Sequence, residues 1–235
     1  MRSELFGQNL ESTSDESLSL QNPRMLKARL QGSELLARQG AMVAYQGSVE
    51  FAYEGAGGVG RFLKKALTGE GVPLMRCRGT GDVFLAQDAN ELHILDLDGN
   101  DGVTVNGANV LAFEPTLTWD IRRVEGASAL SGGVFNMVFS GAGRLVVSAF
   151  GTPVVLNTGE APTFADLQSA IAWSSTLQTR LVRTAGASAL IGRGSGEAFQ
   201  LAFSGQGFLV VQASEGPVVP THNHGSSGGG GGLFS

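Results

Sequence analysis

A glycine-rich run precedes the one stretch of this sequence that has helical periodicity. Gly55-Ala56-Gly57-Gly58-Val59-Gly60 matches the pattern G-x-G-x-x-G, in which glycines let the backbone approach a nucleotide pyrophosphate at the start of a helix. A dinucleotide site also needs a βαβ unit and an acidic residue at the end of the next strand, and the sequence offers neither. We therefore interpret the run as a strand-to-helix loop. Phosphate binding at the start of that helix, with Arg61 as the cation, stays open as an alternative.

Two other patterns resemble metal sites. Asp96–Gly102 has the alternating Asp and Asn residues of a calcium loop, but its glycine is one residue out of step and position twelve is Gly107 instead of glutamate. A hairpin turn with Asp-Gly chemistry explains this segment better. His222 and His224 form a pair, but His93 is distant in the sequence and no Cys or acidic cluster completes a zinc site. The sequence predicts no specific metal and no cofactor.

The sequence contains no complete set of residues for nucleophilic catalysis. There is no G-x-S-x-G elbow, and His93 alternates with apolar neighbours as a structural strand residue would. The single cysteine, Cys77, excludes an intramolecular disulfide, and we interpret it as a small buried hydrophobe rather than a reactive thiol. Trp119 and Trp173 are expected to anchor packing, although either could line a ligand cleft. We predict that the protein is not an enzyme.

The element that follows the glycine-rich run is a predicted short helix. Its apolar residues recur at i, i+3, i+4, i+7 and i+8 from Val59 to Leu67, and Gly69 provides a stop. Arg61, Lys64 and Lys65 fall on the opposite side of this helix. They are the candidate contact for an anion or a membrane surface, although a basic face this short is usually just solvated.

Composition sets the frame for these elements. The 235 residues include 35 glycines and 7 prolines, which favours tight turns between short strands. The net charge is −5, so a general basic surface for nucleic acid is absent. We divide the chain into a polar leader (1–24), one β domain (25–218) and a flexible Gly-rich tail (219–235). No signal-peptide or membrane-span pattern occurs, which predicts a cytoplasmic protein.

The β domain repeats itself three times, over roughly 25–98, 99–160 and 161–218. Each copy has a short apolar run that ends in an aromatic residue, as in Val110-Leu111-Ala112-Phe113 and Ala170-Ile171-Ala172-Trp173. Each copy later has a Gly-x-Gly triplet before an apolar strand, at Gly79–Gly81, Gly141–Gly143 and Gly205–Gly207. We expect each triplet to be a tight turn that leads into a buried strand. The fold class predicted is all-β, a sandwich of three diverged repeats with one inserted helix.

Several segments also resemble a known family. The segments are Leu20–Leu26, Ala37–Tyr45 and Gly60–Gly71, the last containing Gly69-Glu70-Gly71. They are similar to the bacterial relatives of the altered inheritance of mitochondria protein, a mitochondrial biogenesis family described as having a fold like the tryptophan RNA-binding attenuation protein. The resemblance implies an attenuation-protein-like β-sandwich, of the double-stranded β-helix type, that assembles into a homotrimer. It implies no established reaction.

Three functions are weighed on these grounds. The first is a non-catalytic oligomeric scaffold or interaction protein, suggested by the repeats and the missing catalytic groups. The second is a small-ligand-binding module at subunit interfaces, and the third is a peripheral membrane-associated organiser that uses Arg61, Lys64 and Lys65. RNA binding is disfavoured because the matched positions Asp82, Arg144 and Phe208 share no chemistry.

Overall fold

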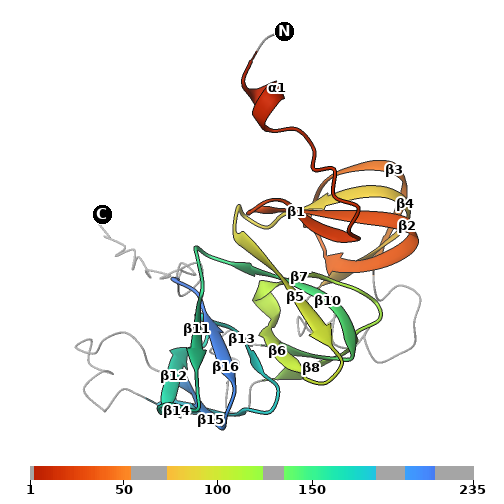
Figure 1. The fold of residues 1–235 in the computed structure, drawn as a ribbon. Coiled ribbons are helices and arrows are strands. Elements are labelled where there is room, and N and C mark those ends of the chain that lie inside the picture. The colour runs from red at the N-terminus through yellow and green to blue at the C-terminus, as the bar shows by residue number, and fades with distance from the viewer. Residues whose placement is uncertain (1–2, 54–72, 124–134, 184–198, 215–235) are drawn as a thin grey trace, which may run out of the picture.

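The computed structural model describes residues 3–53, 73–123, 135–183 and 199–214 (Figure 1). Within these ranges the regular secondary structure is almost entirely β-strand, and all strand pairs are antiparallel. The exceptions are one turn of α-helix, α1 (Leu5–Gln8), and one 3₁₀ turn, η1 (Gly107–Asn109). The predicted all-β fold with several packed antiparallel sheets is therefore confirmed.

The first sheet has seven strands. Their order is β3-β4-β2-β7-β10-β5. The seventh strand, β1, pairs with the beginning of β2, whereas β7 pairs with the end of β2. The strands are β1 (Leu18–Asn22), β2 (Met25–Arg38), β3 (Met42–Tyr53), β4 (Leu74–Leu85), β5 (Glu91–Asp98), β7 (Val110–Phe113) and β10 (Ala142–Ala149).

Two smaller sheets complete the described fold. The second sheet has the order β11-β16-β13-β6-β9-β8, and the third has the order β12-β15-β14. The strands of the second sheet are β6 (Val103–Asn106), β8 (Thr118–Arg123), β9 (Phe135–Ser140), β11 (Val154–Asn157), β13 (Ala170–Ser174) and β16 (Phe208–Val211). Those of the third are β12 (Thr163–Asp166), β14 (Gln178–Arg183) and β15 (Phe199–Ser204).

Residue alternation explains how these strands bury one face. In β2, Leu26, Ala28 and Leu30 are buried in a core cluster with residues of β4, β7 and β10. The side chains between them, Lys27 and Arg29, necessarily point to the other face of the sheet. Further along the chain, Trp119 stacks edge-to-face on Phe113 and Trp173 on Phe203, with ring centroids 5.6 and 5.5 Å apart. Both tryptophans anchor packing, as predicted.

The later strands form two sets whose pairings correspond to each other. In the first set, β9 lies between β6 and β8, and β10 lies between β5 and β7. In the second set, β15 lies between β12 and β14, and β16 lies between β11 and β13. Residues 91–149 and 154–211 therefore use the same order of pairings. The threefold sequence repeat itself stays a prediction, as does the likeness to the attenuation protein. The predicted helix at 59–67 lies outside the described residues.

The Gly-x-Gly triplets do not all make turns. Gly141 separates β9 from β10, and the third triplet separates β15 from β16, as expected. The first triplet is instead inside the 12-residue strand β4, with φ of +136° at Gly79 and +148° at Gly81. A Cβ at Gly81 would lie 2.0 Å from the carbonyl oxygen of Gln46 on β3. Here glycine lets β3 and β4 approach closely, so the strand continues where the later copies change sheet.

Two other predictions need correction. Residues 18–22, assigned to the polar leader, form strand β1, because Leu18 is buried in the core and Ser19 pairs with Lys27. The turn at Asp98–Gly102 does not make a hairpin, since β5 lies in the first sheet and β6 in the second. Its chemistry is nevertheless that of a turn: Asn100 donates to the Asp98 carboxylate from its backbone N–H at 2.9 Å and from its side chain at 3.0 Å.

Candidate functional site

A pair of cations lies on the outer face of β2. Lys27 and Arg29 are two residues apart and so point to the same side, and Asp82 on β4 stands directly opposite Arg29. Asp82 Oδ2 lies 3.4 Å from Lys27 Nζ, and Asp82 Oδ1 accepts from Arg29 Nε at 3.2 Å. The Lys27 side chain is only 2% exposed. Something must cover it, since a lysine this buried requires partners for its charge.

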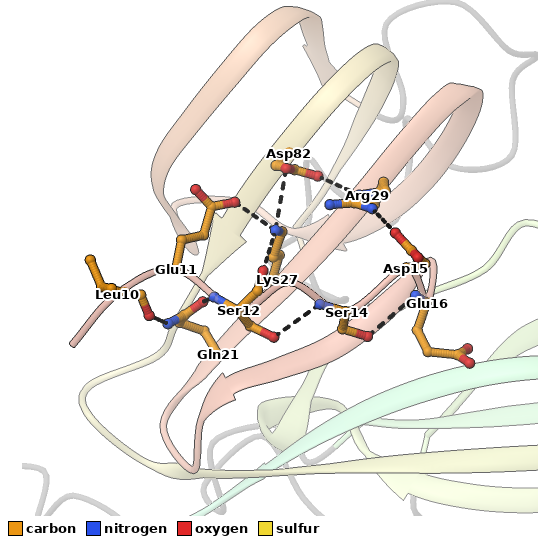
Figure 2. Close-up of polar contacts among 10 residues, drawn as sticks. All are labelled: Leu10, Glu11, Ser12, Ser14, Asp15, Glu16, Gln21, Lys27, Arg29 and Asp82. Carbon is orange, nitrogen blue, oxygen red and sulfur yellow. Dashed lines mark hydrogen bonds and ion pairs between the residues drawn. The ribbon is translucent and has the colours of Figure 1, made fainter. Parts of the chain in front are cut away.

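The cover is a segment from the N-terminal part of the chain, residues 10–17, which we call the strap (Figure 2). Glu11 Oε1 accepts from Lys27 Nζ at 2.5 Å, and the Ser12 carbonyl oxygen accepts from the same amine at 2.8 Å. Asp15 Oδ1 accepts from Arg29 Nη1 at 2.7 Å. The strap thus places one carboxylate on each of the two β2 cations.

A third cation continues the pattern on β10. Arg144 Nη1 lies 3.1 Å from Glu16 Oε2, and Arg144 Nε lies 3.4 Å from Glu114 Oε1. Arg144 also donates to the Ser17 hydroxyl and, at 3.2 Å, to the Leu18 carbonyl oxygen. We call Lys27, Arg29 and Arg144 the cationic groove. Each of its members contacts one carboxylate of the strap and one carboxylate from outside it, either Asp82 on β4 or Glu114 directly after β7.

The strap backbone is also held directly. Gln21 on β1 donates from Nε2 to the Leu10 carbonyl oxygen at 2.9 Å and accepts from the Ser12 N–H at 2.7 Å. Within the strap, the Ser12 hydroxyl accepts from the Ser14 N–H and the Ser14 hydroxyl from the Glu16 N–H, both at 3.3 Å. These serine turns shape the strap locally.

The charges of this arrangement are paired with one another. The Lys27 ammonium donates hydrogen bonds to Glu11 and to the Ser12 carbonyl oxygen, and it forms an ion pair with Asp82. The Arg29 pKa is raised, first by its hydrogen bond to Asp82, which keeps this guanidinium charged. The groove is therefore a set of positive charges that bind the acidic strap of the same chain.

A second ion cluster lies further along β2 and β4. Glu34 accepts from Arg76 and Arg78, which are two residues apart and share a face of β4. The hydrogen bond from Arg76 is the main cause that lowers the Glu34 pKa below its usual 4.5. This cluster joins two neighbouring strands.

The predicted Cys77 behaviour is confirmed. Its side chain is fully buried in the core, and burial raises the thiol pKa to about 11. A thiol with this pKa stays protonated at neutral pH and is a poor nucleophile.

His93 is a strand residue, as predicted, and also lines a pocket. It pairs with Val147 across β5 and β10. The pocket has a volume of about 360 Å³ and is lined mainly by apolar atoms of Leu20, Asn22, Pro23, Glu91, Leu92 and His93. His93 Nε2 and the nearby Asn90 Nδ2 are buried without a hydrogen-bond partner.

Several candidates from the sequence lie outside the described residues. They are the glycine-rich run 55–60, the basic residues Arg61, Lys64 and Lys65, the tail 219–235, and with it His222 and His224. Their roles stay predictions. In the ranges that are described, no group of three or more His, Cys, Asp or Glu residues is placed to hold a metal. The α-helix of those ranges, α1, has four residues, whereas crossing a bilayer takes about 20.

Sequence reasoning missed the groove, although two signals were present. Glu11, Asp15 and Glu16 lie close together within the predicted polar leader. Lys27 and Arg29 occupy two consecutive polar positions in the alternation of β2, on the same face. Complementary charge in two segments close in sequence could have suggested the contact, but Asp82, Glu114 and Arg144 are too distant in the sequence to be assigned by pattern.

The sequence matches the model of a known protein family. The model of the family described as mitochondrial biogenesis AIM24 matches residues 18–214. The chain belongs to the AIM24 family. The AIM24 match begins at β1, so the strap lies before the matched residues.

A solved structure has a similar fold. A crystal structure of a Streptococcus pyogenes protein is similar with a TM-score of 0.68 and 22% sequence identity, covering 84% of this chain and 92% of that one. At this identity the likeness concerns the fold alone. The comparison with curated proteins gave no match.

Proposed function

We propose that this protein is a non-catalytic scaffold that assembles with copies of itself, as the homotrimer expected from the resemblance, and interacts with other proteins. We place it in the cytoplasm. The observation that carries the proposal is strand β3, at the edge of the seven-stranded sheet. Within the described residues, β3 pairs with β4 alone, so one side of its 12-residue backbone is open to a further strand.

The side chains of β3 favour such association. Met42, Val43, Tyr45 and Tyr53 are all exposed large hydrophobic residues. Natural edge strands are usually protected by charged residues, proline or short length, because an open edge pairs readily with another chain. Over its whole length β3 has one charged residue, Glu50, and no proline. An edge this long and this unprotected supports an interface.

A second edge has the same character. β11 ends the six-stranded sheet, and its Val154 and Val155 are exposed. A trimer closed by a threefold axis joins two different surfaces of each chain. Two separate apolar edges are consistent with that kind of contact.

Native mass spectrometry of the full chain tests the proposal. We expect a trimer for the wild type and a smaller species for Tyr45→Lys/Ser48→Pro, which places a charge and a proline on β3. Tyr45 packs edge-to-face on Phe51, so Val43→Lys serves as a second variant that disturbs no ring pair. A wild type that is a monomer at micromolar concentration would overturn the proposal.

Ligand binding is the second candidate, favoured by the pocket beside His93. Its lining is mainly apolar and includes His93, whose buried Nε2 has no hydrogen-bond partner, and this combination suits a small amphipathic molecule. The same native spectra distinguish it: an additional mass that is lost on denaturation would favour this function, and its loss in Leu92→Trp would place the molecule in the pocket.

A further inference from the structure

The strap is bound almost entirely by polar contacts. Between Glu11 and Ser17 the sequence has no large apolar residue, and Leu10 at its beginning is 69% exposed. Two of its three ion pairs use carboxylates that are mostly in solvent, Asp15 and Glu16. Exposed pairs of this kind contribute little to stability. Glu11 on the buried Lys27 is the strong contact, and the rest of the strap is held weakly.

The groove is organised by the sheet and not only by the strap. Asp82 orients both Lys27 and Arg29, and Glu114 holds Arg144 through the Nε contact and also accepts from the Arg144 backbone N–H at 2.9 Å. When the strap leaves, each cation keeps one carboxylate of the sheet and so stays in place. A preorganised set of cations binds an acidic ligand with little loss of side-chain freedom.

The contacts also select a peptide rather than a simple anion. Gln21 donates to the Leu10 carbonyl oxygen and accepts from the Ser12 N–H, two groups of the strap backbone that are two residues apart. Lys27 donates to the Ser12 carbonyl oxygen as well as to the Glu11 carboxylate. A polyphosphate has no N–H to donate to Gln21, and neither has the sugar-phosphate backbone of a nucleic acid. The net charge of −5 also disfavours a long polyanion.

We propose that the cationic groove is a binding site for extended acidic segments of partner proteins, and that the strap is its resident intramolecular occupant. This proposal rests on the scaffold function and names the chemistry of the partner. The segment that fits is the one the strap displays: an acidic residue, three small polar residues, and two further acidic residues, as in Glu11-Ser12-Thr13-Ser14-Asp15-Glu16. A partner segment competes with the strap, which has the advantage of being attached to the same chain.

Fluorescence anisotropy with a labelled peptide of residues 9–17 tests the proposal on full-length protein. In Glu11→Gln/Asp15→Asn/Glu16→Gln the strap keeps its shape but loses its charges. We expect this triple variant to bind the peptide at least about tenfold more tightly than the wild type, because the resident competitor is weakened. The control peptide carries the same three neutral replacements, and a scrambled peptide of unchanged composition tests the spacing.

Variants of the groove, added to the triple variant, locate the site. We expect Arg29→Gln and Lys27→Met each to weaken peptide binding about tenfold, and Gln21→Ala to weaken it without changing any charge. Circular dichroism establishes that each variant folds; if Lys27→Met does not, Arg29→Gln and Gln21→Ala carry the test. Arg122→Gln, an exposed arginine on β8, is the matched control and should have no effect.

The outcomes separate cleanly. Equal binding by the wild type and the triple variant, or equal binding of the scrambled peptide, would overturn the proposal. Competition by inorganic polyphosphate as strong as by the unlabelled peptide would show general anion binding and overturn it too. The assembly mass is measured on the same samples: an unchanged trimer without peptide binding refutes this inference and leaves the scaffold proposal intact. A changed mass in the triple variant would place the strap on a neighbouring copy and refute its intramolecular role.

Discussion

Asp82 lies directly opposite Arg29 across the β2–β4 ladder, and its second carboxylate oxygen also reaches Lys27 Nζ at 3.4 Å. One acidic residue therefore fixes two cations on the outer face of the sheet. The three acidic residues of the strap bind the charges that are thus oriented, together with Arg144. This relationship makes an N-terminal acidic run part of the folded protein.

Lys27→Met should destabilise the protein by about 2 kcal/mol. Removing one partner of a buried ion pair costs about 3–5 kcal/mol where the other charge stays buried, but Asp82 keeps Arg29 and Glu11 is partly exposed. Urea unfolding followed by circular dichroism measures the change. Arg122→Met, on a pair 3.9 Å apart and exposed on both sides, should change stability by less than about 0.5 kcal/mol. An unaltered midpoint for Lys27→Met would mean that its ion pairs contribute nothing net.

High salt should loosen the strap before it affects the sheet. At about 1 M salt the screening length is about 3 Å, which weakens the exposed pairs of Asp15 and Glu16. Hydrogen exchange measured by mass spectrometry should then be faster for residues 10–17 than at low salt, while peptides from β2 and β4 keep their protection. Equal protection of the strap at both salt concentrations would contradict the weak, electrostatic attachment described above.

Gly81→Ala should be severely destabilising, by at least about 3 kcal/mol. The new Cβ would lie 2.0 Å from a backbone oxygen of β3. The alanine would also have to adopt the φ of +148° that Gly81 has. Thermal melting of the two proteins measures the effect. Gly7→Ala, where no atom lies within 4 Å of the added carbon, is the control and should melt like the wild type.

Glu34 should make stability depend on pH in the acid range. Its pKa in the folded state is lowered from 4.5, first by Arg76, so the stabilising contribution is complete above pH 4.5 and is lost as the pH falls through the folded pKa. The difference in melting temperature between the wild type and Glu34→Gln should therefore be large near neutral pH and shrink on acidification. Glu50→Gln on the exposed edge strand is the comparison variant. A difference that stays constant down to about pH 2 would exclude this cause.

The Cys77 thiol should be inert in the native protein. Its pKa of about 11 keeps it protonated, and it is fully buried, so a disulfide reagent at about pH 8 should label it at least about 100-fold more slowly than in urea. A thiol introduced as Thr13→Cys in the background Cys77→Ala, on the exposed side of the strap, should react at once. Rapid labelling of native Cys77 would indicate local opening of β4.

Local pattern determined much of the fold. Apolar runs such as Val110–Phe113 and the abundance of glycine predicted an all-β protein with tight turns, because strand burial and turn conformation depend on neighbouring residues. The same local reasoning placed Cys77 in the core and made Trp119 and Trp173 packing residues. It failed at Gly79–Gly81, since whether a glycine pair turns the chain or lets two strands approach depends on a partner strand.

The sequence by itself therefore determined the strand content, the core residues and the family resemblance. Only the tertiary structure decided that Glu11, Asp15 and Glu16 bind three cations. Each of these cations also forms an ion pair with Asp82 or Glu114. The physical reason is that ion pairs act over a few ångströms of space whatever the distance along the chain. Arg144 meets Glu16 across 128 residues, and no local periodicity records such a contact.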